Sequence, residues 1–258
     1  MTPNQAMTTY PSLGNAVAVI TGGASGIGAA MVESFALQGS RVAFLDLADD
    51  SASRLVDGLT GRAPHRPVYL HCDLTDIAAL RSAMQEAEKR LGPIRVLVNN
   101  AANDDRHRFE DVTSEYWDER MNVNLRHHFF SIQAVAPGMT RAGGGSIINM
   151  SSIAWIIPST GLPVYVTAKA AIVGLTRTMS RELGGANIRV NTISPGAIMT
   201  ERQRRLWMTP DYLAEVLACQ SLKRELLPDD VARLALFLAS EDSSGITGQD
   251  FVMDGGWV

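Results

Sequence analysis

A tyrosine and a lysine, Tyr165 and Lys169, stand four residues apart in the stretch YVTAK. On a helix this spacing brings the phenol and the ammonium group onto one face. A phenol with an ordinary pKa of about 10 is a poor base at neutral pH. Because a nearby cation favours the phenolate, Lys169 is expected to lower the pKa of Tyr165. The pair therefore indicates general acid–base chemistry on a hydroxyl or carbonyl group.

A serine, Ser152, follows the apolar run 147–150, which is predicted to be a strand. In a sheet of parallel strands, ligands bind at the carboxyl ends. Its hydroxyl can hydrogen-bond the same reacting oxygen as Tyr165, which stands 13 residues later. Serine is common at strand ends, so Ser152 alone does not establish a site.

A glycine-rich stretch, 21–28, follows the first predicted strand and precedes a predicted helix at 29–38. Glycines let the backbone turn sharply and approach a pyrophosphate, and the N-terminus of the helix offers free N–H groups. The stretch contains no lysine, which argues against a P-loop nucleotidase. We therefore expect a dinucleotide to contact Gly22, Ser25, Gly26, Ile27 and Gly28.

An aspartate, Asp46, ends the second predicted strand, 18 residues beyond Gly28. A carboxylate there can accept hydrogen bonds from both ribose hydroxyls of NAD and would repel the 2′-phosphate of NADP. Neither Leu47 nor the loop positions 23–25 supply an Arg or Lys to bind such a phosphate. The sequence therefore favours NAD over NADP.

Short apolar runs alternate with helical patterns along the chain, which predicts a parallel sheet covered on both faces by helices. Seven strands are expected, at 15–21, 41–46, 67–72, 94–99, 146–151, 188–193 and 249–253. Residues 1–258 are expected to form one domain, with a leader at 1–14. Residues 197–227, rich in Arg and Met, interrupt the alternation and are expected to cover the substrate. We call them the lid segment.

The composition excludes several classes of protein. The 258 residues are 46% hydrophobic and carry a formal charge of -4, which excludes a disordered chain and disfavours a nucleic-acid binder. No apolar run approaches the roughly 20 residues that span a bilayer, so no membrane partner is expected. The first charged residue is Glu33, so a signal peptide is not indicated. The two isolated cysteines, Cys72 and Cys219, suit the reducing cytoplasm.

The five histidines do not indicate a metal site. His127 and His128 are adjacent, so on a helix their side chains diverge by about 100° and cannot easily share one ion. His65 and His71 have no neighbouring ligands in the sequence. We expect no catalytic metal.

Taken together, these residues resemble the short-chain dehydrogenases/reductases. The resemblance covers 15–258 and is carried by 21–28, Asn99–Ala102, Asn124, Ser152, Tyr165, Lys169 and Pro195-Gly196. It implies a single α/β domain of Rossmann type. Such a domain has a doubly wound parallel sheet of seven strands in the order 3-2-1-4-5-6-7, with helices on both faces. It also implies a homotetramer.

The resemblance implies a role for each matching residue. Tyr165 would be the general acid/base, Lys169 would lower its pKa and hold the nicotinamide ribose, and Ser152 would position the substrate oxygen. Asn124 would maintain a water and the helix geometry behind Lys169. Further cofactor contacts would come from Asp73, Leu74, Asn100, Ala101, Ala102, Pro195, Gly196, Ile198 and Thr200. At Ala102 the family usually has Gly, and the added methyl removes no catalytic group.

Four further residues are candidates for substrate binding. Asn103 and Asp104 follow the turn that edges the cleft in the family, and their polarity suits a polyhydroxylated substrate. Trp155 could offer a flat wall to the C–H face of a sugar, or it could pack in the core or an interface. Arg202 in the lid segment could pair with a substrate carboxylate, or it could be solvated or hold a subunit interface.

Five stretches, 10–13, 103–107, 116–127, 134–139 and 254–257, resemble bacterial NAD-dependent aldose 1-dehydrogenases. This implies oxidation of an aldose of the D-xylose, L-arabinose or L-fucose type at C1 to the aldonolactone. One alternative is oxidation of a secondary alcohol in a sugar acid such as a 2-keto-3-deoxy-aldonate. Another, from a non-enzyme class, is an NAD-binding sensor or scaffold, which the presence of all four catalytic-type residues disfavours.

Overall fold

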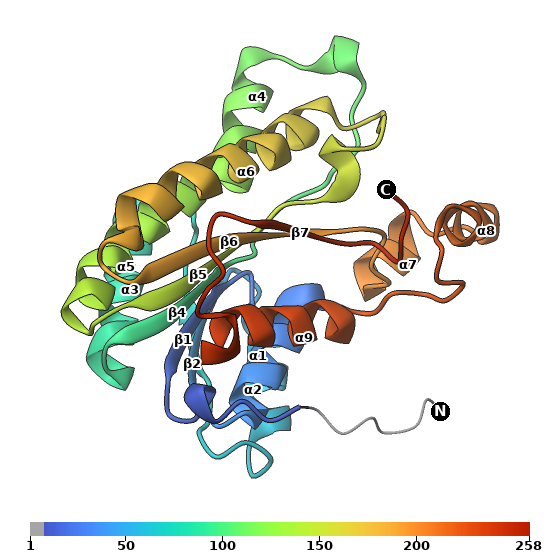
Figure 1. Ribbon diagram of the computed structural model, residues 1–258. Helices are drawn as coiled ribbons and strands as arrows, with labels where there is room; N and C mark the ends of the chain where they lie inside the picture. The colour runs from blue at the N-terminus through green and yellow to red at the C-terminus, as the bar shows by residue number, and fades with distance from the viewer. Residues whose placement is uncertain (1–7) are drawn as a thin grey trace.

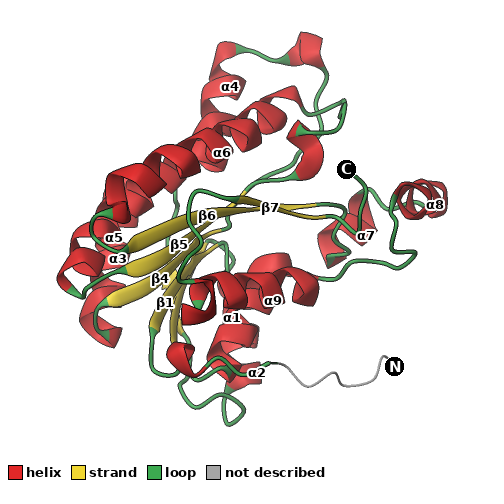
Figure 2. Ribbon diagram, in the orientation of Figure 1, coloured by secondary structure: helices red, strands yellow, loops and turns green. Residues whose placement is uncertain are grey.

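The computed structural model describes residues 8–258. Seven parallel strands form one sheet in the order β3-β2-β1-β4-β5-β6-β7. Figure 2 shows the strands in yellow and labels β1 and β4 to β7. The strands are β1 (Val17–Thr21), β2 (Arg41–Asp46), β3 (Val68–His71), β4 (Ile94–Asn99), β5 (Gly145–Met150), β6 (Ile188–Pro195) and β7 (Asp250–Met253). The predicted fold class and strand order are confirmed. Every residue of β1 is buried, because helices cover both faces of the sheet.

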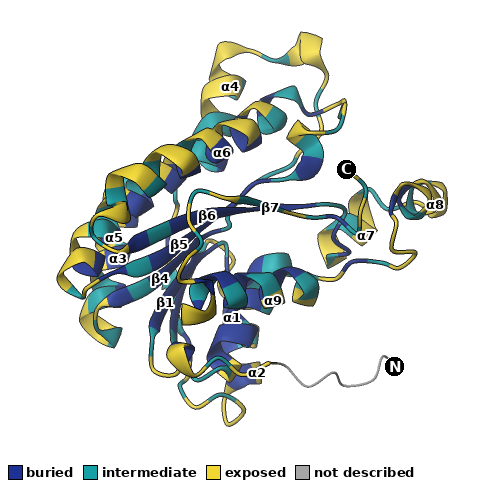
Figure 3. Cartoon of the chain, in the orientation of Figure 1, coloured by how far each residue is buried: buried dark blue, intermediate teal, exposed yellow. Residues whose placement is uncertain are grey.

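Two apolar cores lie on the two faces of the sheet (Figures 1 and 3). One face packs against α1 (Gly26–Leu37), α2 (Asp49–Leu59) and α9 (Pro228–Ala239). The other packs against α3 (Ile77–Leu91), α5 (His127–Arg141) and α6 (Pro163–Gly184). The chain therefore covers one face with α1 and α2, covers the other with α3, α5 and α6, and returns to the first face with α9, as in doubly wound sheets.

Two boundaries differ from the sequence prediction in ways that affect the site. The first helix begins at Gly26, three residues before the predicted start, so the glycine-rich stretch itself forms the first turn of α1. Strand β6 runs to Pro195 rather than ending at residue 193, because Pro195 still pairs with Met253 of β7. Both extensions place backbone at the carboxyl edge of the sheet.

The lid segment leaves the sheet after β6 and carries α7 (Glu201–Leu206) and α8 (Pro210–Cys219). Figure 1 shows these two helices in orange, beyond the ends of β6 and β7. The base of the segment is held by a bridge between Ile198 and Leu226, in which the N–H of Met199 donates to the Leu226 carbonyl over 2.8 Å. The segment is thus anchored at both ends, while its helices lie outside the sheet.

The predicted leader lies partly outside the described residues, which begin at Thr8. The part that is described packs against the domain. Residues Pro11–Leu13 form a short 3₁₀ turn, η1, that buries Leu13, and Ser40 Oγ donates to the Leu13 carbonyl over 2.8 Å. In the part of the chain that the structure describes, no helix has both the length and the apolar character needed to cross a bilayer.

Candidate active site

A cavity of about 950 Å³ lies at the carboxyl ends of the strands, where the sheet order reverses between β1 and β4. This is the place at which doubly wound sheets bind ligands. The structure brings together there every residue predicted to contact the cofactor: Gly22, Ser25, Gly26, Ile27, Gly28, Asp46, Asp73, Leu74, Asn100, Ala101, Ala102, Tyr165, Lys169, Pro195, Gly196, Ile198 and Thr200.

The glycine-rich loop lets two backbone segments meet at the floor of the cavity. A Cβ on Gly28 would lie 1.9 Å from the carbonyl oxygen of Gly22, a distance that no side chain tolerates. Gly26 has a φ of +55°, which disfavours residues with a side chain. The N-terminus of α1 therefore reaches the cavity as bare backbone, which suits the close approach of a pyrophosphate.

Asp46 closes one end of the cavity. Its carboxylate accepts the N–H of Ala24 over 2.9 Å and that of Ala48 over 3.0 Å, so both oxygens are held in fixed directions. Arg54 of α2 also lines this end and donates to Ser51 Oγ over 3.0 Å. The sequence reasoning missed Arg54, because it searched for a cation only at Leu47 and in the glycine-rich loop.

The three predicted reacting side chains, Ser152, Tyr165 and Lys169, line the middle of the same cavity. Lys169 Nζ lies 5.4 Å from the centre of the Tyr165 ring and donates to the Met150 carbonyl over 2.8 Å. Ser151 Oγ donates to the backbone carbonyl of Lys169 over 2.7 Å. The end of β5 therefore holds both the side chain and the backbone of Lys169 in place.

The electrostatics of this group differ from the sequence expectation. The pKa of Tyr165 is raised, first by burial and then by the negative charge of Asp104, while a hydrogen bond with Ser152 and the charge of Arg106 oppose the rise. Burial lowers the pKa of Lys169 to about 7. Burial therefore disfavours the charged forms of both side chains, and its effect on Tyr165 is opposite in direction to the lowered pKa expected from the sequence.

Asn124 lies behind this group rather than in the cavity lining. It is fully buried within a π-helical turn, η3 (Asn122–Arg126), between α4 (Ser114–Met121) and α5. Its Oδ1 accepts the N–H of Asn103 over 2.8 Å, and among the described residues its Nδ2 has no hydrogen-bond partner. A buried donor without a partner suits a bound water, which is the role that the resemblance implied.

The other end of the cavity is formed by loop and lid side chains. Asn103 and Asp104 line it, as does Arg202. Arg202 donates to the carboxylate of Asp104 over 3.2 Å and to that of Asp105 over 2.6 Å, and Gln203 Nε2 donates to Asp104 over 2.6 Å. These contacts join the lid segment to the loop after β4.

Of the two alternatives for Trp155, the structure does not place it as a wall of the cavity. It is 36% exposed and is not among the residues of 8–258 that line the cavity. A different tryptophan, Trp257, lines the cavity from the last residues of the chain, together with Met208 and Tyr212 of the lid segment. The resemblance in residues 254–257 assigned no role to Trp257, because the chain returns to the cavity there only through β7.

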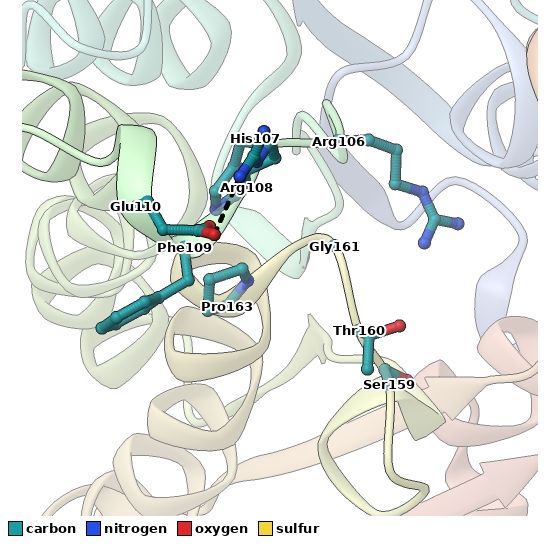
Figure 4. Close-up of a pocket in the computed structure, with 9 residues that line it drawn as sticks. All are labelled: Arg106, His107, Arg108, Phe109, Glu110, Ser159, Thr160, Gly161 and Pro163. Carbon is teal, nitrogen blue, oxygen red and sulfur yellow. Dashed lines mark hydrogen bonds and ion pairs between the residues drawn. The ribbon is translucent and has the colours of Figure 1, made fainter.

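A second hollow of about 630 Å³ adjoins the substrate end of the cavity (Figure 4). The loop of Arg106–Glu110 and the turn of Ser159–Pro163 face one another across it. Arg106 and Ser159 line both spaces, so the hollow is continuous with the rim of the main cavity.

The two buried histidines, His127 and His128, contact a backbone carbonyl and an asparagine side chain. His127 Nε2 lies 3.0 Å from the Ala101 carbonyl, and His128 Nδ1 lies 3.4 Å from Asn149 Oδ1. Within residues 8–258, no group of three or more His, Cys, Asp or Glu side chains could hold a metal ion. The absence of a catalytic metal remains a prediction.

The comparison with protein families gives one match over residues 22–258, to the family model described as enoyl-(acyl carrier protein) reductase. Among curated proteins, the chain is 52% identical over 250 residues to a Rhizobium meliloti protein described as a probable galactose dehydrogenase, covering 96% of each. It is 50% identical over 248 residues to a D-xylose 1-dehydrogenase of Caulobacter vibrioides, covering 96% of this chain and 98% of the relative.

A solved structure of a 7α-hydroxysteroid dehydrogenase, in complex with NADH and 7-oxo glycochenodeoxycholic acid, is similar over the whole domain. The TM-score is 0.91, the sequence identity is 33%, and the match covers 96% of both chains. The cavity, the bare backbone at its floor and the carboxylate at its end fit a dinucleotide. The site therefore takes a nicotinamide cofactor.

Proposed function

This chain belongs to the short-chain dehydrogenase/reductase family, and we propose that it oxidises a free aldose at C1 to the aldonolactone, with NAD as the hydride acceptor. It is an oxidoreductase that acts on a CH–OH group. Two relatives at 50–52% identity are described as a D-xylose 1-dehydrogenase and a probable galactose dehydrogenase, which supports an aldose as the substrate.

In this proposal Tyr165 removes the proton of the anomeric hydroxyl while Ser152 hydrogen-bonds the same oxygen. A bound oxidised nicotinamide supplies the acceptor for the C1 hydride and a positive charge beside the phenol. The C1–O bond becomes the lactone carbonyl as the O–H and C–H bonds break. Because burial raises the pKa of Tyr165, phenolate formation depends on positive charge from its surroundings. Lys169 and a water bound at Asn124 Nδ2 would then carry the proton away from Tyr165.

The preference for NAD rests on Asp46. Its carboxylate is oriented by two backbone N–H groups and keeps lone pairs free to accept ribose hydroxyls. The same charge opposes a 2′-phosphate. Arg54 is a cation at this end, so it is the residue through which NADP could be tolerated. We propose that Asp46 dominates, because its two oxygens are held by the backbone while the Arg54 side chain lies on an exposed helix face.

The observation that favours a neutral sugar over a sugar acid is the pairing of Arg202. Its guanidinium meets two carboxylates, Asp104 and Asp105, so it has little charge to offer to a third. The Asp104 carboxylate itself is an acceptor for sugar hydroxyls, and Asn103 and Gln203 add polar atoms beside it. This end of the cavity therefore suits several hydroxyl groups better than a second anion.

A sugar acid remains the second candidate because of Arg205. This residue lines the same cavity from α7 and is not among the groups that pair with Asp104. A substrate carboxylate that met Arg205 would direct the reaction to a secondary alcohol.

The deciding experiment measures NADH formation at 340 nm with free aldoses beside matched aldonates and 2-keto-3-deoxy acids. Turnover of aldoses, with the lactone or aldonic acid as product, is the expected result. Turnover of the acids alone would overturn C1 oxidation and favour the sugar-acid alternative. NAD binding without turnover of any sugar would favour the sensor or scaffold alternative.

We also propose that the protein is a cytoplasmic homotetramer. The two described cysteines are free thiols, Cys72 buried and Cys219 exposed, which suits a reducing compartment. Large apolar side chains, Trp117 of α4 and Phe129 of α5, are exposed on neighbouring helices and are available for a subunit interface. Light scattering coupled to size-exclusion chromatography tests the tetramer; a monomer of 27.8 kDa would contradict it.

A further inference from the structure

His107 joins the loop after β4 to the start of α6, the helix that carries Tyr165. Its backbone N–H donates to the Gly161 carbonyl over 2.8 Å, and its Nε2 accepts the N–H of Val164 over 3.4 Å. Figure 4 shows the two segments facing one another, with His107 and Gly161 on opposite sides. His107 and Val164 are 57 residues apart in the sequence, so this contact exists only in the folded chain.

The contacts of the imidazole assign different roles to its two nitrogens. The Val164 N–H can only donate, so Nε2 must carry a lone pair. Nδ1 lies 3.0 Å from the Asp105 carbonyl oxygen, which can only accept, so Nδ1 must carry the proton. Tyr116 Oη lies 2.9 Å from the same nitrogen and adds a third polar contact to the ring. These contacts together hold the ring in one orientation.

The start of α6 needs an acceptor from elsewhere in the chain. The first N–H groups of a helix have no partner within it, and a side chain at the N-cap usually accepts one of them. Here the N-cap residue is Leu162, whose apolar side chain cannot accept, and the next residue, Pro163, has no N–H. Val164 therefore presents the first free N–H of the helix, and His107 accepts it.

Tyr165 follows Val164 directly and lies between two anchors. Upstream is the bond from Val164 to His107, and downstream the Lys169 carbonyl accepts from Ser151. The loop that carries His107 also carries Asp104 and Asp105, which bind the lid segment. A shift at the start of α6 would therefore move the phenol relative to the side chains that line the substrate end of the cavity.

We propose that His107 is a positioning residue, which caps the N-terminus of α6 and thereby fixes the Tyr165 hydroxyl relative to the substrate. The inference rests on the proposed role of Tyr165 in proton transfer. His107 itself is not among the residues of 8–258 that line the main cavity, so it acts through Val164 and not by contact with the substrate.

Three substitutions separate the contacts of His107. In His107→Gln the amide oxygen can reach the position of Nε2 and accept the Val164 N–H. His107→Met has the same length but no acceptor of comparable strength. His107→Asn places its amide near Nδ1, where it can still donate to the Asp105 carbonyl but cannot reach Val164.

We expect His107→Gln to retain kcat within about twofold, and the Met and Asn variants to lose about tenfold or more, because small displacements of a reacting group have effects of this size. KM for the aldose and for NAD should change much less than kcat. Thermal unfolding and NADH fluorescence titration, run on every variant, identify those that fold and bind cofactor. If one of the two impaired variants fails to fold, the other decides.

Full kcat in a folded Met or Asn variant would overturn the positioning role. A loss of kcat in the Gln variant equal to that in the Met and Asn variants would also overturn it. The Gln variant keeps an acceptor for the Val164 N–H, so this acceptor would then not be what maintains kcat. Tyr165→Phe, measured beside them, separates this inference from the proposed function. If Tyr165→Phe is inactive while all His107 variants are fully active, only the inference on His107 fails.

Discussion

The two ends of the cavity are built in different ways. The cofactor end consists of backbone and of residues at strand ends, such as Gly28 and Asp46, which the buried sheet holds in place. The substrate end consists of exposed or half-exposed side chains on a loop and on the lid segment, such as Asp104 and Arg202, which hold one another by ion pairs. Tyr165 and Lys169 lie between the two ends and serve both.

This difference indicates that the cofactor end tolerates fewer substitutions than the substrate end. Replacing a residue at the cofactor end disturbs the sheet, because a Cβ or a lost carboxylate affects buried backbone. Replacing a residue at the substrate end exchanges one solvated polar contact for another, and such contacts contribute little to stability. Five substitutions or conditions, in order of decreasing effect, test this contrast.

Tyr165→Phe should have the largest effect, because it removes the proposed proton acceptor of the reaction. We expect kcat to fall by about 10³-fold or more, in the range of a lost general base. NADH binding, measured by fluorescence titration, should change by less than about twofold. Residual turnover near the wild-type rate would remove Tyr165 from the acid–base role.

Gly28→Ala should come next, because the new Cβ would lie 1.9 Å from the Gly22 carbonyl oxygen. We expect NADH affinity to fall by about 100-fold or the protein to unfold, since neither backbone segment can move freely. Gly58→Ala is the matched control, because within residues 8–258 no heavy atom beyond its chain neighbours and the backbone of its own helix lies within 4 Å of the Cβ position at Gly58. Wild-type NADH binding by a folded Gly28→Ala variant would contradict the close packing of this loop.

Asp46→Ala should lower kcat/KM for NAD by about 10- to 100-fold, the worth of a charge-assisted hydrogen bond to the ribose. Activity with NADP should stay the same or rise, since the repulsion of the 2′-phosphate is gone. Initial rates with both cofactors measure the ratio, and Asp50→Ala on the exposed start of α2 is the control. Equal losses with NAD and NADP would show that Asp46 holds the loop and does not select the cofactor.

The buried histidine pair should make stability fall in acid. Burial and the charge of Lys169 lower the pKa of His127 from 6.5 to about 4. Between these values the unfolded chain binds the proton and the folded chain does not, so stability present above pH 6.5 is lost as the pH falls through 4, at no more than about 1.4 kcal/mol per pH unit.

Thermal unfolding of the wild type and of His127→Gln at several pH values between 7.5 and 4.5 tests this. Glutamine can still donate to the Ala101 carbonyl but does not titrate, so its melting temperature should fall less in acid. His65→Gln, at a half-buried histidine outside this pair, is the control. Parallel pH profiles for wild type and His127→Gln would show that His127 does not contribute to the loss.

Arg202→Gln should have the smallest effect. The Arg202 side chain is 45% exposed, and exposed ion pairs contribute about 0.2–1 kcal/mol. We expect KM for the aldose to rise by about two- to fivefold, with kcat and the melting temperature nearly unchanged. Arg204→Gln, in the same helix but paired with Glu225, is the control. A rise of more than about 100-fold in KM would indicate that Arg202 binds the substrate directly and would favour a sugar acid.

Much of the fold was predictable because its signals are local. Two strands, Arg41–Asp46 and Ile94–Asn99, have the predicted bounds, since an apolar run ends where the chain leaves the buried sheet. The helix start at Gly26 was missed, because two glycines suggest a loop, whereas here the close approach to Gly22 carries them into the first turn of α1.

The sequence by itself determined a parallel sheet covered on both faces, the glycine-rich loop with its aspartate, and the helical pair of Tyr165 and Lys169. Each depends on periodicity or on spacing within one element or between neighbouring ones. The tertiary structure alone decided the pairing of Arg202, the place of Trp257, and the contact of His107 with Val164. These depend on where loops return after long excursions, and a solvated loop carries no period from which its partner can be derived.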